Sequence, residues 1–210
     1  MVAGGKALAN VESKGNWISL FNGSDVTEHW QGDTRKYVAK DGILVCEKGG
    51  KYLETRKEYS DFAFSFEFKL EANGNNGIGI RVPSGGHPSR QGMEIQILDH
   101  HGSKYLKKSA DGKMVSKLKP WQFHGSIYGH VPAKTGYLKP VGQWNSETII
   151  CIKDHIRVIL NGAIIVDAHL DKVMAATGKK HAGLSRRKGH ISLAGHNDRL
   201  EFRNLKVAEF

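Results

Sequence analysis

The chain has 210 residues and a formal net charge of +10, from 31 Lys and Arg against 21 Asp and Glu. No run reaches the roughly 18 apolar residues that a membrane-spanning helix needs, and the first residues show no signal peptide. This length suits one buried core, so we expect a flexible N-terminal segment at residues 1–16 and a single domain over residues 17–210. Cys46 and Cys151 lie inside apolar runs and are expected to be buried free thiols, with a disulfide between them as the alternative.

The first third of the chain predicts short strands joined by tight turns. The run Trp17–Phe21 ends at the turn dipeptide Asn22-Gly23, and Asp41-Gly42 separates two short apolar runs as in a two-residue hairpin. The clearest strand covers residues 62–70, where one face carries Phe62, Phe64, Phe66, Phe68 and Leu70. Five large apolar side chains on one face need a second sheet to cover them.

Two further strand-like runs carry polar side chains on one face. In residues 76–81, alternation places Arg81 beside two glycines, and in residues 92–99 it places Glu94 and Gln96 opposite apolar side chains. Glycines would let a ligand approach the backbone closely. We therefore expect Arg81, Glu94 and Gln96 to converge on one ligand-binding face, with an ordinary Arg81–Glu94 ion pair as the alternative interpretation.

The second half predicts more strands around one long irregular stretch. Residues 100–122 are polar and lysine-rich, and we expect them at the rim of the site, partly covering it. Residues 125–129 form a short strand or turn, Asn161-Gly162 closes a hairpin, and residues 173–188 are irregular and basic. The final strand, with an irregularity at Asn204, completes an all-β fold, a two-sheet antiparallel sandwich or jelly roll without a long helix.

Several runs of the chain occur in an order and spacing that point to one family. They are WISLFNGSD (17–25), NNGIGIR (75–81), GMEIQILD (92–99), GSIYG (125–129), GQWN (142–145) and LEFRNLKV (200–207). Together they resemble the 3-keto-disaccharide hydrolase family over nearly the whole chain. The resemblance implies a concanavalin A-like jelly roll of the lectin/glucanase type, with a site on its concave face. It also implies bacterial, periplasmic or secreted proteins whose substrate is a sugar or glycoside oxidised at C3.

Two departures from the family pattern lie in the motifs themselves. Asn76 stands where serine is usual, and residues 193–197 read LAGHN where the family often has Leu-Gln-Asp-His-Gly. His196 is kept, whereas the glutamine and the aspartate are lost. If those two groups help to bind substrate, this protein prefers a different sugar or leaving group.

A carbonyl at C3 of a sugar opens a cleavage route through the hydrogen on C2, which it acidifies. The route needs a base, an electrostatic partner for the enolate oxygen and an acid for the leaving group. Glu94 or His196 is the candidate base, and Arg81 or a bound cation is the candidate partner of the enolate. His124, Tyr128 or the second member of the Glu94 and His196 pair is the candidate acid.

An ordinary glycosidase would instead need two carboxylates across the scissile bond. Glu94 and Asp99 are the acidic pair near the central strand, and alternation turns them to opposite faces, which disfavours that mechanism. Asp99 could instead cap the next turn, or bind a divalent metal ion with His100 and His101, although adjacent strand positions point in alternating directions.

The candidate substrate-binding residues are Asn76, Gln96, Tyr128, Trp121, His124 and Asp99. A non-catalytic, lectin-like carbohydrate-binding module is the alternative function, since the same fold supports it. The basic stretches at residues 179–181 and 186–188 lack a nucleic-acid motif, so a nucleic acid is not the expected partner. The metal requirement and the oligomeric state stay open at this point.

Overall fold

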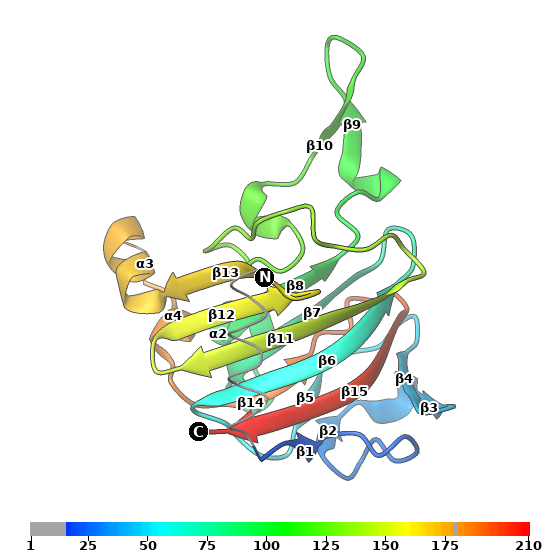
Figure 1. Cartoon of the computed structure of the whole chain (residues 1–210), viewed down its shortest axis with the longest axis vertical. Helices are drawn as coiled ribbons and strands as arrows, with labels where there is room; N and C mark the ends of the chain where they lie inside the picture. Colours follow the sequence, from blue (N-terminus) through cyan, green and yellow to red (C-terminus); the bar gives the residue numbers. More distant parts are fainter. Residues whose placement is uncertain (1–15, 179) are drawn as a thin grey trace.

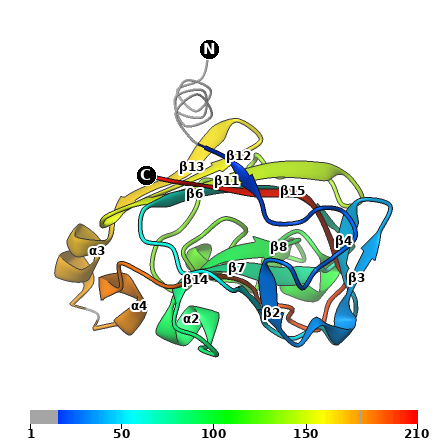
Figure 2. The ribbon, with the colours of Figure 1, turned by 90° about the horizontal axis from the view of Figure 1, so that it is seen from below.

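Two antiparallel sheets lie face to face in the computed structural model, which describes residues 16–178 and 180–210 (Figures 1 and 2). The expectation for residues 1–16 therefore falls outside the described residues, except for residue 16. The larger sheet has eight strands, in the order β13 (Ala163–His169), β12 (His155–Leu160), β11 (Trp144–Ile152), β6 (Phe62–Leu70), β15 (Leu200–Glu209), β4 (Ile43–Cys46) and β3 (Tyr37–Lys40), with β1 (Ile18–Ser19) paired to β15.

The smaller sheet has five strands and carries the polar-faced runs. Its order is β2 (Trp30–Gly32), β5 (Leu53–Thr55), β14 (His190–Leu193), β7 (Asn75–Val82) and β8 (Met93–Leu98). A separate two-stranded hairpin, β9 (Leu106–Lys108) with β10 (Met114–Ser116), projects from the sandwich in Figure 1. The predicted all-β, two-sheet antiparallel fold is confirmed.

The helices are short. They are α2 (Pro88–Gln91), α3 (Leu170–Thr177) and α4 (Ala182–Ser185), with single 3₁₀ turns at Thr34–Lys36, Ser103–Tyr105 and Pro120–Gln122. Residues 173–188 were expected to be irregular, but they include most of α3 and all of α4. The run Trp17–Phe21 forms a strand only at Ile18–Ser19. No helix among the described residues is long and apolar enough to span a membrane.

The core forms where the phenylalanine face of β6 meets the smaller sheet. Phe62, Phe64, Phe66 and Phe68 are each no more than 1% exposed. Phe64 and Phe66 stack with ring centroids 5.0 Å apart. Each buried ring stabilises the fold by roughly 1.5–3 kcal/mol, which explains why the two-residue period of this strand was so informative. Both cysteines are buried free thiols, as expected.

The hairpin turns adopt the backbone that their sequences predict. Asp41 and Gly42 have φ of 53° and 74°, and they join β3 to β4 in an antiparallel pair. Asn161 and Gly162 have φ of 49° and 83° between β12 and β13. Positive φ at both central residues is the requirement of the type I′ turn, whose twist matches that of the flanking strands.

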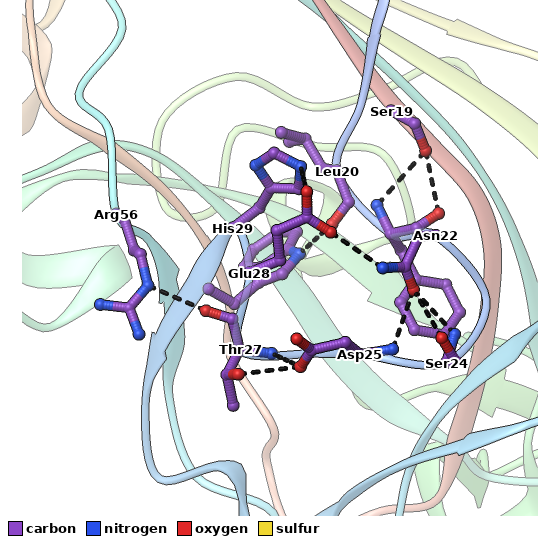
Figure 3. Close-up of polar contacts among 11 residues, drawn as sticks. Ser19, Leu20, Asn22, Ser24, Asp25, Thr27, Glu28, His29 and Arg56 are labelled. Carbon is purple, nitrogen blue, oxygen red and sulfur yellow. Dashed lines mark hydrogen bonds and ion pairs between the residues drawn. The ribbon is translucent and has the colours of Figure 1, made fainter.

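A polar turn precedes β2 and is held by its own side chains (Figure 3). The Asn22 side-chain oxygen accepts hydrogen bonds from the backbone N–H groups of Ser24 and Asp25, at 2.9 and 2.8 Å. The indole N–H of Trp30, which is fully buried, donates to the Leu20 carbonyl oxygen at 2.7 Å. The opening motif of the chain thus has a structural role, because these hydrogen bonds fix the segment that leads into β2 at one end of the sandwich.

Candidate active site

The outer face of β8 lines the first of two neighbouring cavities. Its core face carries Met93, Ile95 and Ile97, whereas Glu94, Gln96 and Leu98 turn away from the large sheet. They line a cavity of about 500 Å³, with α2 on the same outer side of the small sheet (Figure 2). The other lining residues are Asn75, His87, Ser89, Arg90, Tyr105, Leu118, Gln122, Tyr128 and His196.

Glu94 occupies the space that the glycines of β7 leave open. Gly77 pairs with Gln96 and Gly79 with Glu94 across the two strands. A Cβ atom on Gly77 would lie 2.2 Å from Glu94 Oε1, and one on Gly79 would lie 2.1 Å from the Ser192 hydroxyl oxygen. The glycines therefore make room for a carboxylate and a hydroxyl, and not for direct approach of a ligand to the backbone as we had expected.

His196 meets Glu94 from a sharply turned segment after β14. Its Nε2 lies 2.6 Å from Glu94 Oε1, a short charge-assisted contact. Residues 195–197 all have positive φ, between 44° and 77°, which is a strained conformation for His196 and Asn197. Strain of this kind persists only where neighbouring groups impose it, and here it presents the imidazole to the carboxylate.

Asn76 is one of the groups that impose this turn. Its side chain is fully buried, and its oxygen accepts hydrogen bonds from the backbone N–H groups of Gly77 and Gly195, at 2.8 and 3.1 Å. Asn76 was predicted to bind substrate. Because it shares the core face with Ile78, it instead holds the turn that carries His196.

The cavity holds both signs of charge. Arg90, on α2, lines the same cavity as the Glu94–His196 pair, and its guanidinium group has no ion-pair partner among the described residues. Burial and the Arg90 charge lower the pKa of His87, which also lines the cavity. His87 therefore favours its neutral form there. A neutral imidazole and an unpaired guanidinium together suit a ligand that develops negative charge.

The segment after the lysine-rich stretch contributes Tyr128 to the lining of the cavity. Ser126 and Gly125 exchange backbone hydrogen bonds with Gln96, and the Tyr128 N–H donates to the Glu94 carbonyl oxygen at 2.8 Å. This pairing covers the open edge of β8 and delivers Tyr128 to the cavity. The predicted position of residues 100–122 at the rim is confirmed, because Tyr105, Leu118 and Gln122 all contribute to the wall.

Arg81 does not line the cavity, so the expectation that it converges with Glu94 and Gln96 on one face is wrong. It has φ of 52°, at an irregularity where the register of β7 against β14 shifts. This bulge breaks the alternation and buries the guanidinium completely. There it donates to the carbonyl oxygens of Ser60 and Lys153, at 2.7 and 2.6 Å. Arg81 therefore has a structural role, since it links the loops that contain Ser60 and Lys153.

Three other candidates for substrate binding lie outside the cavity lining. The Asp99 side chain accepts a hydrogen bond from the Asn73 backbone N–H at 2.8 Å, so it supports the turn between β6 and β7. In the turn after β8, the Gly102 N–H bonds to the backbone carbonyl oxygen of Asp99 and not to its side chain. His124 is buried, with Nδ1 accepting from the Leu98 N–H at 3.2 Å and Nε2 3.1 Å from the Glu147 carboxylate. Trp121 is 40% exposed and does not line the cavity.

Comparison with known proteins identifies the family of the chain. The model of the 3-keto-alpha-glucoside-1,2-lyase-like domain matches residues 16–208. The chain belongs to this family. A relative from Bacteroides thetaiotaomicron, 3-keto-disaccharide hydrolase, is 23% identical over 91% of this chain and 77% of its own length.

Solved structures agree on the fold of this 3-keto-glucoside lyase-like domain. Two crystal structures of proposed glycosyl hydrolases from Parabacteroides distasonis are 26% and 25% identical, with TM-scores of 0.78 and 0.79. The matches cover 93% and 96% of this chain, and 100% and 96% of those chains. The κ-carrageenase of Pseudoalteromonas carrageenovora shares the fold at 9% identity and a TM-score of 0.53, covering 93% of this chain and 96% of its own.

Sequence reasoning missed several residues of the cavity. Arg90, His87 and Ser89 come from the short connection between β7 and β8, in which no period-two pattern operates. The available signal was their position, since this connection joins the two strands that were already expected to carry the site. Within residues 16–178 and 180–210, no group of three or more His, Cys, Asp or Glu side chains has the arrangement of a metal site.

Proposed function

We propose that this protein cleaves 3-keto-glycosides by removing the hydrogen on C2 of the oxidised sugar. The observation that carries the proposal is the contact between Glu94 and His196 in a cavity that also holds Arg90. Membership of the 3-keto-glucoside lyase-like family supports the substrate class. A protein that only binds sugars has no need of a coupled carboxylate–imidazole pair.

In this proposal His196 carries the proton and Glu94 makes it a better base. Glu94 Oε1 engages Nε2 of the imidazole. Nδ1 is therefore the ring nitrogen that would take the proton in this proposal. The carboxylate then stabilises the imidazolium that forms when His196 takes the C2 proton. The side chain of His196 is 27% exposed and that of Glu94 only 3%, which matches a proton carrier in contact with substrate and a buried partner behind it.

The electrons can be followed through each step. The C2–H pair becomes a C2=C3 double bond, and the C3 oxygen gains the negative charge, which the Arg90 guanidinium would hold. When the C3 carbonyl forms again, a C1=C2 double bond appears, the C1–O bond breaks and the leaving oxygen receives the proton. Water adding across C1=C2 then gives net hydrolysis.

The lining of the cavity argues against a conventional glycosidase. Among its described residues Glu94 is the only carboxylate, and Asp99 is engaged with the Asn73 backbone elsewhere. Retaining and inverting enzymes both use two carboxyl groups across the bond. An imidazole, a guanidinium and a single carboxylate suit chemistry through an enolate better.

The test compares a 3-keto-glucoside with its unoxidised parent, with products analysed by mass. We expect cleavage of the keto sugar alone, and deuterium at C2 of substrate or product in heavy water. Glu94→Gln should lower kcat/KM by about 10²-fold or more because it keeps the shape and removes the charge. Equal cleavage of the unoxidised parent without exchange would point to a conventional glycosidase.

The same experiment separates an enzyme from a binding module. Binding of both sugars without cleavage, with or without added divalent metal ions, would favour the lectin-like alternative. The family resemblance also leads us to propose a periplasmic or secreted location, which fractionation of the source bacterium would test.

A further inference from the structure

A second cavity adjoins the proposed reaction centre and has been given no role so far. It has a volume of about 390 Å³ and is lined by Gly50, Lys51, Tyr52, Ala194, His196 and Asn197. His196 is the residue that it shares with the first cavity. The two cavities therefore adjoin at His196, while Glu94 and Arg90 line only the first one.

Tyr52 and His87 stand where the two cavities meet. Their rings make an edge contact, with centroids 5.3 Å apart, and each residue lines a different cavity. Burial and the negative charge of Glu94 both raise the pKa of Tyr52, so its hydroxyl lies within electrostatic reach of the reaction centre. Tyr52 is nevertheless 37% exposed, which leaves surface of its side chain open to a ligand.

The backbone around the second cavity is held in place. A Cβ atom on Gly195 would lie 2.3 Å from the Gly50 carbonyl oxygen, so the two backbones pack in direct contact. The Tyr37 hydroxyl donates to the Lys51 carbonyl oxygen at 2.7 Å. A preformed hollow of this kind loses little entropy when a ligand is ordered in it.

We propose that the second cavity holds the leaving group of the substrate, as a ring that stacks on Tyr52. This assignment rests on the proposed function, and it follows from where the base lies. The keto sugar must present its C2 to the Glu94–His196 pair, which places that ring in the first cavity. The group on C1 then extends past His196, the residue common to both cavities, and the bond to be broken lies beside the imidazole.

The chemistry of the second cavity defines the class of leaving group. Tyr52 is its aromatic side chain, and its described lining contains no carboxylate. An aromatic side chain packs against a ring that has an apolar face, which both a pyranose and an aromatic aglycone possess. A leaving group without a ring would leave Tyr52 without a contact.

The experiment uses the full chain and three substrates that share one oxidised sugar. They are the methyl, the phenyl and the glucosyl 3-keto-α-glucosides. Tyr52→Ala should lower kcat/KM by about 5- to 10-fold for the phenyl and glucosyl substrates and leave the methyl substrate within about twofold. Tyr52→Phe keeps the ring and should preserve the preference. Tyr137→Ala removes an exposed tyrosine outside both cavities and serves as the matched control.

Each outcome decides a separate point. A loss confined to the phenyl or to the glucosyl substrate supports the cavity and identifies which ring it takes. An equal loss for all three substrates, or no loss for any, overturns the assignment of Tyr52 while the proposed function stands. If the wild-type protein cleaves none of the three, the proposed function fails, and the leaving-group assignment fails with it.

Discussion

The side-chain oxygen of Asn76 lies 3.1 Å from the backbone nitrogen of Gly195 and accepts its hydrogen bond, one residue before His196. A buried amide in the small sheet thus fixes the turn that brings the imidazole to Glu94. In the proposed reaction this makes Asn76 a positioning residue, which would act through the backbone of the turn that carries His196.

Asn76→Ala should therefore lower kcat/KM by about 10-fold, with most of the loss in kcat, because the turn loses a hydrogen bond that holds His196 in a strained conformation. Kinetics on the 3-keto substrate and a denaturation curve measure the two effects. Asn76→Ser retains an acceptor oxygen and should recover part of kcat. Unchanged kcat in Asn76→Ala would show that the turn keeps its conformation without the hydrogen bond from Asn76.

Gly77→Ala should remove most activity and leave a folded protein. The added Cβ would lie 2.2 Å from Glu94 Oε1, so the carboxylate must move away from His196. Gly77 does not have positive φ, and alanine is therefore tolerated by the backbone there. We expect a fall in kcat of about 10²-fold, measured at matched concentrations of folded protein.

Gly79→Ala is the matched control for Gly77→Ala. Its Cβ would point from the same face of β7, but its nearest neighbours would be the Ser192 hydroxyl oxygen at 2.1 Å and the side chains of Val82 and Pro88 at 2.8 and 3.0 Å, and not the Glu94 carboxylate. This variant should retain most of the activity per folded molecule. If both variants lose activity equally, damage to the strand explains the effect, and displacement of the carboxylate does not.

Arg81→Met should destabilise the protein without a direct effect on catalysis. The buried guanidinium donates to three backbone carbonyl oxygens, those of Ser60, Lys153 and Arg186, and lies 3.4 Å from Asp61. Removing it leaves those acceptors unpaired, which should cost about 3 kcal/mol in the free energy of unfolding. Urea denaturation tests this value. A large fall in kcat for the folded fraction would show that Arg81 takes part in the reaction.

His100 should make the protein less stable at acidic pH. Burial is the main cause that lowers the pKa of His100 from 6.5 to about 4. The unfolded chain binds this proton more readily, so its contribution is complete above pH 6.5 and is lost as the pH falls towards 4. At pH 5 the loss should be about 2 kcal/mol.

His100→Phe should remove this dependence. The imidazole stacks on Phe123 with centroids 5.0 Å apart, and neither ring nitrogen has a hydrogen-bond partner among the described residues. Phenylalanine fills the same place without a group that titrates. The difference in unfolding free energy between variant and wild type, measured from pH 7.5 to 5, should grow as the pH falls. A constant difference would contradict the prediction.

Regular alternation and turn chemistry predicted the parts of the fold that depend on neighbouring residues. The phenylalanine strand and the Asp41-Gly42 hairpin are local in this sense, and both are confirmed. Glu94 and Gln96 line the cavity for the same reason, because β8 keeps its period to the end. Tyr128 and His196, which the sequence offered as candidate acid and base, line the same cavity.

The predictions that failed concern residues whose position depends on partners far away in the sequence. The sequence around Arg81 does not predict a bulge, since arginine is not a residue that favours positive φ. His124 is held by Glu147, which lies on a strand of the other sheet. Arg90 lies in a short helix that begins at Pro88 between two strands, and only the folded arrangement brings it into the same cavity as Glu94.

The placement of β15 beside β6 has a consequence for how the protein folds. β15 runs from Leu200 to Glu209 and pairs with β6, which begins at Phe62, and with β4, which begins at Ile43. The centre of the large sheet therefore closes only when segments more than a hundred residues apart meet. Contacts of such long range slow folding towards the millisecond-to-second range. Until β15 arrives, the phenylalanine strand lacks a central neighbour, so chains that stop short of residue 200 should aggregate through it.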